Sequence, residues 1–264
     1  MTKSWQKRLR RREEVKRRAA ESSTFFKNCR VIGCKEPARA ATQDGLDTRF
    51  CRRHADQYAR HGSPYRKSYK ASELNPYRRT ALDWLVTHER DRLVVNAIQR
   101  VQGLYDRAGP HIEAFRLRGL TPRERANVAW ARLRYRKIDP RVVVATWLAV
   151  EMKTKDDPQA DTKSEYKRVQ AAKVIHRLAS GTHKRWSAQG NGKTVELHVF
   201  PASRGNVLRY IGEDLERAVE LLAEHALKDL LTFMNERKRW PRAAVVRPHP
   251  RKLRPRASHD APEA

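Results

Sequence analysis

Cysteine is scarce in this sequence of 264 residues, and long apolar runs are absent from it. Its three cysteines all fall within one short stretch, which is too few for a disulfide framework. The longest uncharged stretch in the middle of the chain is Val142 to Val150, while a membrane-spanning helix needs about 20 apolar residues. No apolar region follows the basic first residues, as it would in a secretory signal. These absences predict a cytoplasmic protein that does not span a membrane.

Acidic residues are also in short supply, with 30 Asp and Glu against 58 Lys and Arg. The formal net charge of +28 and the pI near 10.7 predict a polyanionic partner. We expect nucleic acid, most of all double-stranded DNA, and an anionic membrane surface is the competing interpretation. The sequence makes no prediction about protein partners.

The positive charge is concentrated at the two ends of the chain. Residues 1 to 20 carry nine Lys or Arg and two Glu, and residues 237 to 256 carry nine Lys or Arg, four prolines and no acid. Such blocks are typically solvated arms that contact phosphates without reading sequence. The alternative is that they only keep the protein soluble. On the first interpretation, phosphate contacts in the N-terminal arm are expected from Arg8, Arg10, Arg11 and Arg12.

The three cysteines and one histidine form the pattern Cys29-x4-Cys34-x16-Cys51-x2-His54. Thiolates and an imidazole in two closely spaced pairs are the ligands of a closed tetrahedral zinc site. Three inert cysteines, or one disulfide with an odd thiol, are the alternative, but a disulfide explains neither His54 nor the spacing. We therefore expect zinc as the cofactor, bound by these four residues.

Residues around the four ligands indicate how the site is built. Gly33 precedes the second cysteine, where a tight knuckle turns backbone amides toward sulfur. An Asp-Gly pair between residues 38 to 42 and 46 to 50 predicts a β-hairpin. The second ligand pair opens a helix that Gly62 ends. A knuckle, a hairpin and a helix that carries the second ligand pair predict a treble-clef-like zinc module.

This segment resembles a small zinc-binding module of phage and bacterial mobile-element proteins. The resemblance rests on the first cysteine pair, on Cys51 to His54 (CRRH) and on Arg60 to Pro64 (RHGSP), and it covers residues 27 to 66. In those proteins the module often accompanies HNH-type homing endonucleases and DNA-binding regulators. The resemblance implies a zinc-bearing, DNA-associated protein of the bacterial nucleoid, but no particular reaction. Beyond residue 66 the chain resembles no family.

Composition divides the chain into five segments. We expect a basic arm over residues 1–26, the zinc-binding module over 27–66, a basic linker over 67–79, a helical domain over 80–240 and a basic disordered tail over 241–264. The end of the module and the linker combine basic residues with tyrosines, which can pair phosphates and stack bases. The alternative is that these side chains pack on the next domain. Contacts to nucleic acid from this part of the chain are predicted for Arg52, Arg53, Arg66 and Lys67.

The fold class expected for the whole chain is mainly α with small β-hairpins. Apolar periodicity predicts one helix from Thr80 to Gly109, and capping residues at Thr121, Asp139 and Thr162 predict three more. Alternation with period two then predicts a β-hairpin near residues 184–201, followed by a long amphipathic helix. Three tryptophans, Trp130, Trp147 and Trp186, are expected in the core.

Short helices followed by a hairpin are the order of elements in a winged-helix domain. On this interpretation the helix from Thr162 enters a major groove and the hairpin is the wing. The alternative is a helix whose basic face is only solvated. The contacts that the winged-helix-like interpretation predicts are Lys167, Arg168, Arg177, Lys184 and Arg185.

The sequence shows no catalytic constellation. Its histidines are scattered, and it has no glycine-rich phosphate loop, Gly-x-Ser-x-Gly or His-Glu-x-x-His motif. The favoured function is therefore a non-enzymatic, zinc-stabilised DNA-binding protein, a regulator or accessory factor of a bacterial mobile element or phage. The first alternative is an HNH-like or other metal-dependent nuclease or recombination enzyme, with a site assembled from distant residues. The second alternative is an RNA-binding protein.

Overall fold

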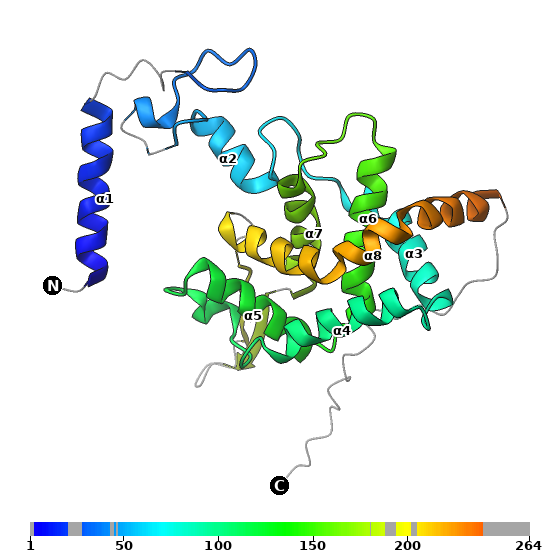
Figure 1. Cartoon of the computed structure of the whole chain (residues 1–264). Helices are drawn as coiled ribbons and strands as arrows, with labels where there is room; N and C mark the ends of the chain where they lie inside the picture. Colours follow the sequence, from blue (N-terminus) through cyan, green and yellow to red (C-terminus); the bar gives the residue numbers. More distant parts are fainter. Residues whose placement is uncertain are drawn as a thin grey trace, which may run out of the picture. The chain divides into compact units, whose positions relative to one another are not determined.

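The computed structural model describes residues 3–20, 28–42, 45, 47–179, 181–187, 194–201 and 205–239. The chain divides into two compact units, Met1–Lys67 and Ser68–Ala264. The described part is mainly helical and contains one two-stranded antiparallel sheet (Figure 1). The tail predicted over 241–264 lies outside the described residues, as does the side chain of Arg8.

The first unit contains two α-helices and one short turn of 3-10 helix. Its elements are α1 (Lys3–Ala20), η2 (Arg39–Ala41) and α2 (Arg52–His61). Basic residues dominate α1, and the side chains of Arg10, Arg11 and Arg12 are exposed on it. This helix therefore presents positive charge to solvent.

The β-hairpin predicted over residues 38–50 is wrong for the residues described there, which form a loop. Residues 39–41 turn into η2, and only the N–H groups of Arg39 and Ala40 reach across the loop, to Phe50 O (3.0 Å) and Asp47 O (2.9 Å). The carboxylate of Asp47 accepts from the N–H of Arg49 at 2.8 Å and of Phe50 at 3.2 Å. This local capping competes with the cross-strand ladder that a hairpin requires.

The second unit is a bundle of six α-helices with one hairpin among its described residues. In chain order the elements are α3 (Ala71–Thr87), α4 (Arg92–Asp106), η3 (Ala114–Leu117), α5 (Pro122–Tyr135), α6 (Pro140–Asp156), α7 (Ser164–Ala179), β1 (Thr182–Ser187), β2 (Thr194–Val199) and α8 (Asn206–Arg239). The long helix α8 packs against each of the other five helices (Figure 1). It is therefore the element around which the second unit is organised.

The start of α3 corrects the predicted linker over 67–79, because the helix begins at Ala71 and continues through Pro76. The side chains of Leu74 and Tyr77 are buried in the bundle. Burial of these two apolar side chains outweighs the local cost of a proline inside the helix. Thr80 is therefore an interior residue of α3 and caps no helix.

The single helix predicted up to Gly109 is in fact two. Helix α3 ends at Thr87, and α4 begins after Asp91, whose carboxylate accepts from the N–H of Leu93 at 2.7 Å. An Asp in this position is a strong helix N-cap, so the sequence carries a signal for the break. The apolar periodicity nevertheless continues across the break and predicts a single helix.

Two predicted helix starts are confirmed. The Thr121 hydroxyl accepts from the N–H of Glu124 at 3.3 Å, while the Glu124 carboxylate accepts from the N–H of Thr121 at 2.6 Å. At the start of α6, Asp139 accepts from the N–H of Arg141 at 2.8 Å. Both helices have proline as their first residue, where its missing N–H costs nothing.

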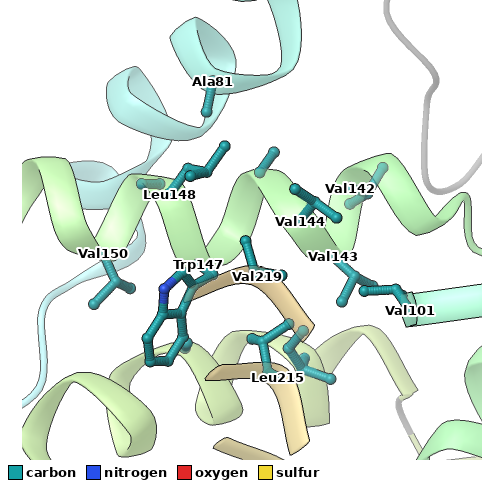
Figure 2. Close-up of a cluster of buried hydrophobic side chains, with 14 of the residues drawn as sticks. Ala81, Val101, Val142, Val143, Val144, Trp147, Leu148, Val150, Leu215 and Val219 are labelled. Atoms are coloured by element: carbon teal, nitrogen blue, oxygen red, sulfur yellow. The ribbon is translucent and has the colours of Figure 1, made fainter. Parts of the chain in front are cut away.

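Helix α6 forms the centre of the hydrophobic core. Its uncharged stretch from Val142 to Val150 is buried on all sides, because α3, α4, α7 and α8 surround it. Figure 2 shows Trp147 and Leu148 of this helix among side chains of the neighbouring helices, such as Leu215 of α8. The stretch is therefore a core helix. None of the helices that the structure describes is long and apolar enough to cross a bilayer.

Helix α7, predicted to enter a major groove, lies inside the bundle. Only Ser164 and Arg177 of its sixteen residues are exposed. Arg168 forms an ion pair with Glu216 of α8, and Lys167 pairs with Glu151 of α6 at 2.9 Å. These basic side chains hold the bundle together, so the structure does not support a recognition helix here.

The hairpin of β1 and β2 pairs Thr182 with Val199 and Ser187 with Thr194, and its turn lies outside the described residues. Most of its side chains are exposed on both faces. Trp186 is 48% exposed, so its predicted place in the core is wrong, whereas Trp130 and Trp147 are buried as predicted. Trp186 pairs with Val195, which is also exposed, although Lys184 on the same strand contacts Glu113 and Phe115.

Two glycines in helices should respond oppositely to substitution by alanine. A Cβ at Gly212 of α8 would meet the backbone oxygen of Arg168 at 2.5 Å, so Gly212→Ala should destabilise the second unit by about 1–3 kcal/mol. A Cβ at Gly103 of α4 would meet only the guanidinium of Arg107 at 3.0 Å, which can move. Gly103→Ala should therefore be neutral or stabilise by up to about 1 kcal/mol. Urea unfolding of both variants measures the two changes, and equal effects would contradict the close approach of α7 and α8.

Candidate metal centre

The four residues of the Cys/His pattern converge on one point in the first unit. Their ligand atoms, three Sγ and one His54 nitrogen, all lie within 4.8 Å of one another. The Nδ1 of His54 is 3.4 Å from the Sγ of Cys29 and 3.3 Å from the Sγ of Cys51. The Sγ atoms of Cys34 and Cys51 are 4.0 Å apart, about twice the length of a disulfide bond, and all three cysteines are free. The four could therefore hold one metal ion.

The first ligand pair lies on a tight backbone turn. The N–H of Cys34 donates to the carbonyl of Val31 at 3.0 Å, and Gly33 between them has φ +79°. The N–H of Cys29 donates to Glu36 O at 2.9 Å, which closes the base of the turn. A residue with a side chain is strained at this φ, so glycine allows the turn to bring the two sulfurs together.

The second ligand pair lies at the start of α2. Cys51 is the N-cap residue, and His54 follows three residues later on the same face of the first helical turn. The carbonyl of Cys51 accepts the N–H of Ala55 at 2.8 Å, which fixes the cysteine at the helix end. Gly62 ends the helix in the left-handed conformation at φ 77°, as its position predicts.

The apolar surroundings of the centre are small. Cys29, Val31, Phe50, Cys51 and Ala55 form a buried cluster, separate from the core of the second unit. The ring of Phe50 also contacts that of Tyr58, with centroids 5.2 Å apart. A core of this size supplies little stability by itself, and modules of this kind usually depend on a bound metal.

Three thiolates so close together repel one another unless a cation lies beside them. For Cys29, burial opposes ionisation, but backbone hydrogen bonds at Cys51 and Val31 and the neighbouring thiols outweigh it and lower its pKa. For Cys34, a backbone hydrogen bond at Glu36 favours the thiolate, but burial and the charge of Cys29 raise its pKa. A metal ion removes this conflict, since it stabilises every thiolate at once.

Most basic residues predicted to contact nucleic acid in the first unit reach solvent. Arg52 and Arg53 are exposed in the first turn of α2, between the ligands Cys51 and His54. Lys67 is also exposed, and Arg66 is half-buried. With the three arginines on α1, these side chains place positive charge on both helices of this unit.

The candidates in the second unit are mostly engaged with carboxylates. In addition to the two pairs of α7, Lys184 of β1 lies 2.8 Å from Glu113, and Arg185 lies 3.1 Å from Glu196. Arg177 is exposed near the end of α7. The structure therefore does not gather the five predicted contacts of this unit into one basic surface.

Arg132 and His176 form a pair in the second unit that the sequence does not predict. Arg132 of α5 is 4% exposed, and its pKa falls to about 10, first because of burial and then because of the charge of Arg136. Burial, and then Arg132, lower the pKa of His176 to about 4, so this imidazole is neutral at physiological pH. The two residues come from α5 and α7 and follow no motif, so the sequence carries no signal for the pair.

Within the part of the chain that the structure describes, the Cys/His cluster is the one group of three or more His, Cys, Asp or Glu side chains close enough to hold a metal ion. Its four protein ligands can complete a tetrahedral coordination sphere. Comparison with family models, with curated proteins and with solved structures gives no match. The function is therefore inferred from this cluster and from the distribution of charge.

Loss of one ligand should release the metal and unfold the module. Cys51→Ala removes one thiolate and should abolish the stoichiometric metal that wild-type protein carries, because a structural metal ion contributes about 10 kcal/mol or more to folding of such modules. Amides of residues 28–64 should then lose protection in hydrogen exchange, while the second unit keeps its own. His61→Ala, on the same helix but outside the cluster, is the matched control and should keep the metal. Wild-type protein without metal after expression in metal-replete medium would refute the site.

Proposed function

We propose that this chain is a zinc-stabilised protein that binds double-stranded DNA, as a regulator or accessory factor of a bacterial mobile element or phage. The observation that carries the proposal is the buried four-ligand cluster within a strongly basic segment. Residues 28 to 67 contain nine Lys or Arg and four acids, and the metal ligands lie within that segment. The mobile-element origin rests on the resemblance of this segment alone.

Zinc is the metal that fits the donor set and the distances best. A tetrahedral ion with Zn–S near 2.3 Å and Zn–N near 2.0 Å requires sulfurs about 3.8 Å apart and sulfur–nitrogen separations of about 3.6 Å. The separations here are 4.0 Å for the Cys34–Cys51 pair, and 3.3 and 3.4 Å for the sulfur–nitrogen pairs. Tetrahedral sites of thiolate and imidazole are typical of zinc.

The role of the zinc is structural in this proposal. Cys29 is 6% exposed, Cys51 5% and His54 9%, while Cys34 is half-buried, so water has little access to three of the four ligands. A catalytic zinc keeps one position open for water or substrate, whereas four protein ligands close the coordination sphere. The turn at Cys29–Cys34 and the helix after Cys51 support a treble-clef-like module, with a loop in place of its hairpin.

The proposal assigns the DNA contacts to the first unit, which includes the basic arm. Arginines reach solvent on both α1 and α2, where they can pair with phosphates and release condensed counterions. In the second unit, four of the five basic residues predicted to contact DNA form ion pairs with carboxylates. These carboxylates would have to be displaced before a phosphate could bind. The bundle therefore serves as a scaffold in this proposal, and the winged-helix mode of docking is not part of it.

Salt dependence of binding tests this assignment. Affinity for duplex DNA should fall steeply between 50 and 200 mM salt, with a slope of roughly 0.9 per phosphate neutralised. Replacing Arg10, Arg11 and Arg12 by glutamine should weaken binding to all duplexes and reduce the slope by up to about 3. The charge-matched control replaces Arg90, Arg92 and Arg118, which are exposed on the second unit, and should leave the slope unchanged.

The titration should include single-stranded DNA and RNA of the same length at each salt concentration. Tighter binding to RNA than to duplex DNA would favour the RNA-binding alternative. A plasmid-nicking assay with added divalent metal completes the test, and cleavage above a mock preparation would favour the nuclease alternative. Equal losses from the two triple variants would mean that net charge matters and its position on α1 does not.

A further inference from the structure

The most exposed large apolar side chain among the described residues lies on the turn between the first two metal ligands. Ile32 is 90% exposed, and Tyr65 beside it is 53% exposed. The next residue inward, Val31, is 8% exposed and belongs to the buried cluster of the module. The turn therefore directs one apolar side chain inward and places the following one at its outer tip.

The position of this tip is fixed by hydrogen bonds and by the metal ligands. The N–H of Ile32 donates to the hydroxyl of Tyr65 at 3.4 Å, which joins the turn to the segment after α2. The buried hydroxyl of Ser63 accepts from the N–H groups of Tyr65 at 3.2 Å and Arg66 at 3.1 Å. Cys29 and Cys34 hold the two ends of the turn at the metal centre. The tip is therefore an apolar side chain in a defined position, available to a binding partner.

Charge around the tip indicates what that partner is. Arg30, Lys35 and Lys67 are exposed next to it in sequence, and Glu36 is the one acidic residue in residues 28–37 and 62–70. An apolar contact surrounded by cations matches a ligand with an apolar interior and an anionic rim. Stacked base pairs between two phosphate backbones have this character.

We propose that Ile32, supported by Tyr65, is a wedge that enters a base-pair step of duplex DNA, while the neighbouring cations contact the flanking phosphates. This inference rests on the proposed function and specifies how the module contacts DNA. Proteins that bend DNA from the minor groove insert aliphatic side chains such as isoleucine between base pairs. Single strands are instead bound on aromatic platforms within grooves, which a branched aliphatic side chain on a protruding turn does not provide.

The test measures both affinity and unstacking with the full-length, metal-loaded protein. Duplexes that carry 2-aminopurine at successive positions should brighten on binding, because a base next to the wedge loses its stacking partner. Ile32→Ala should abolish this signal and weaken duplex binding roughly fiftyfold, the loss expected when three buried methyl or methylene groups are removed. Its metal content and salt slope should equal those of wild-type protein, since neither a ligand nor a charge is changed.

Two further variants separate the wedge from general effects. Tyr65→Phe keeps the ring and removes the hydroxyl that accepts from the N–H of Ile32, so a loss of about threefold is expected. Leu221→Ala removes an aliphatic side chain that is 45% exposed on α8 and should change neither signal. The proposal is overturned if Ile32→Ala binds duplex DNA as wild-type protein does, if wild-type protein leaves 2-aminopurine stacked, or if Ile32→Ala weakens only single-strand or RNA binding.

Failure of the wedge differs from failure of the proposed function. If wild-type protein binds duplex DNA with a steep salt dependence while Ile32→Ala changes nothing, the module binds DNA without a wedge. If wild-type protein binds no nucleic acid at any salt concentration, the proposed function and the wedge are both wrong.

Discussion

The convergence of three sulfurs and one imidazole nitrogen is the constraint on which the first unit depends. Brought within 4.8 Å of one another, these groups cannot all be thiolate and neutral imidazole unless a cation holds them. The opposite pKa shifts of Cys29 and Cys34 express this conflict. A small apolar cluster surrounds the ligands, so in our proposal a bound metal, more than this core, holds the knuckle against α2. On this proposal, exposed features of the module, such as the turn that bears Ile32, depend on that metal for their position.

The second unit is stabilised in a different way and uses its charges differently. Its core is the apolar helix α6, surrounded by four other helices, and several of its basic side chains are paired with acids. Asp214 of α8 accepts from Trp130 Nε1 at 3.1 Å and from Arg123 at 2.8 Å, and Asp83 of α3 pairs with Arg237. Buried carboxylates of this kind need their cationic partners, because an unpaired charge in a core is costly. The large positive charge of the chain is thus partly structural, and only the remainder is free to attract a polyanion.

The sequence predicted the convergence of the four Cys and His side chains, because its signals are local. Spacing along a turn and one helical turn determines which ligands meet, and capping residues such as Thr121 and Asp139 act within three residues. Predictions failed where the outcome depends on distant partners. Pro76 remains helical because Leu74 and Tyr77 are buried in the bundle, Trp186 lies on a hairpin whose side chains are mostly exposed, and the basic residues of α7 meet acids from other helices. Periodicity shows that a residue lies on a face, but it does not show what covers that face.

In our proposal the zinc-held module, and not the helical bundle, is the surface that meets DNA. Hydrogen exchange of the zinc-loaded protein with and without a duplex distinguishes the two surfaces, because it locates the protected amides on each unit. We expect added protection over the turn at Ile32, the start of α2 and residues 63–67, with α7 unchanged. Protection confined to α7 and the β1–β2 hairpin would contradict this proposal and would restore the bundle as the DNA-binding element.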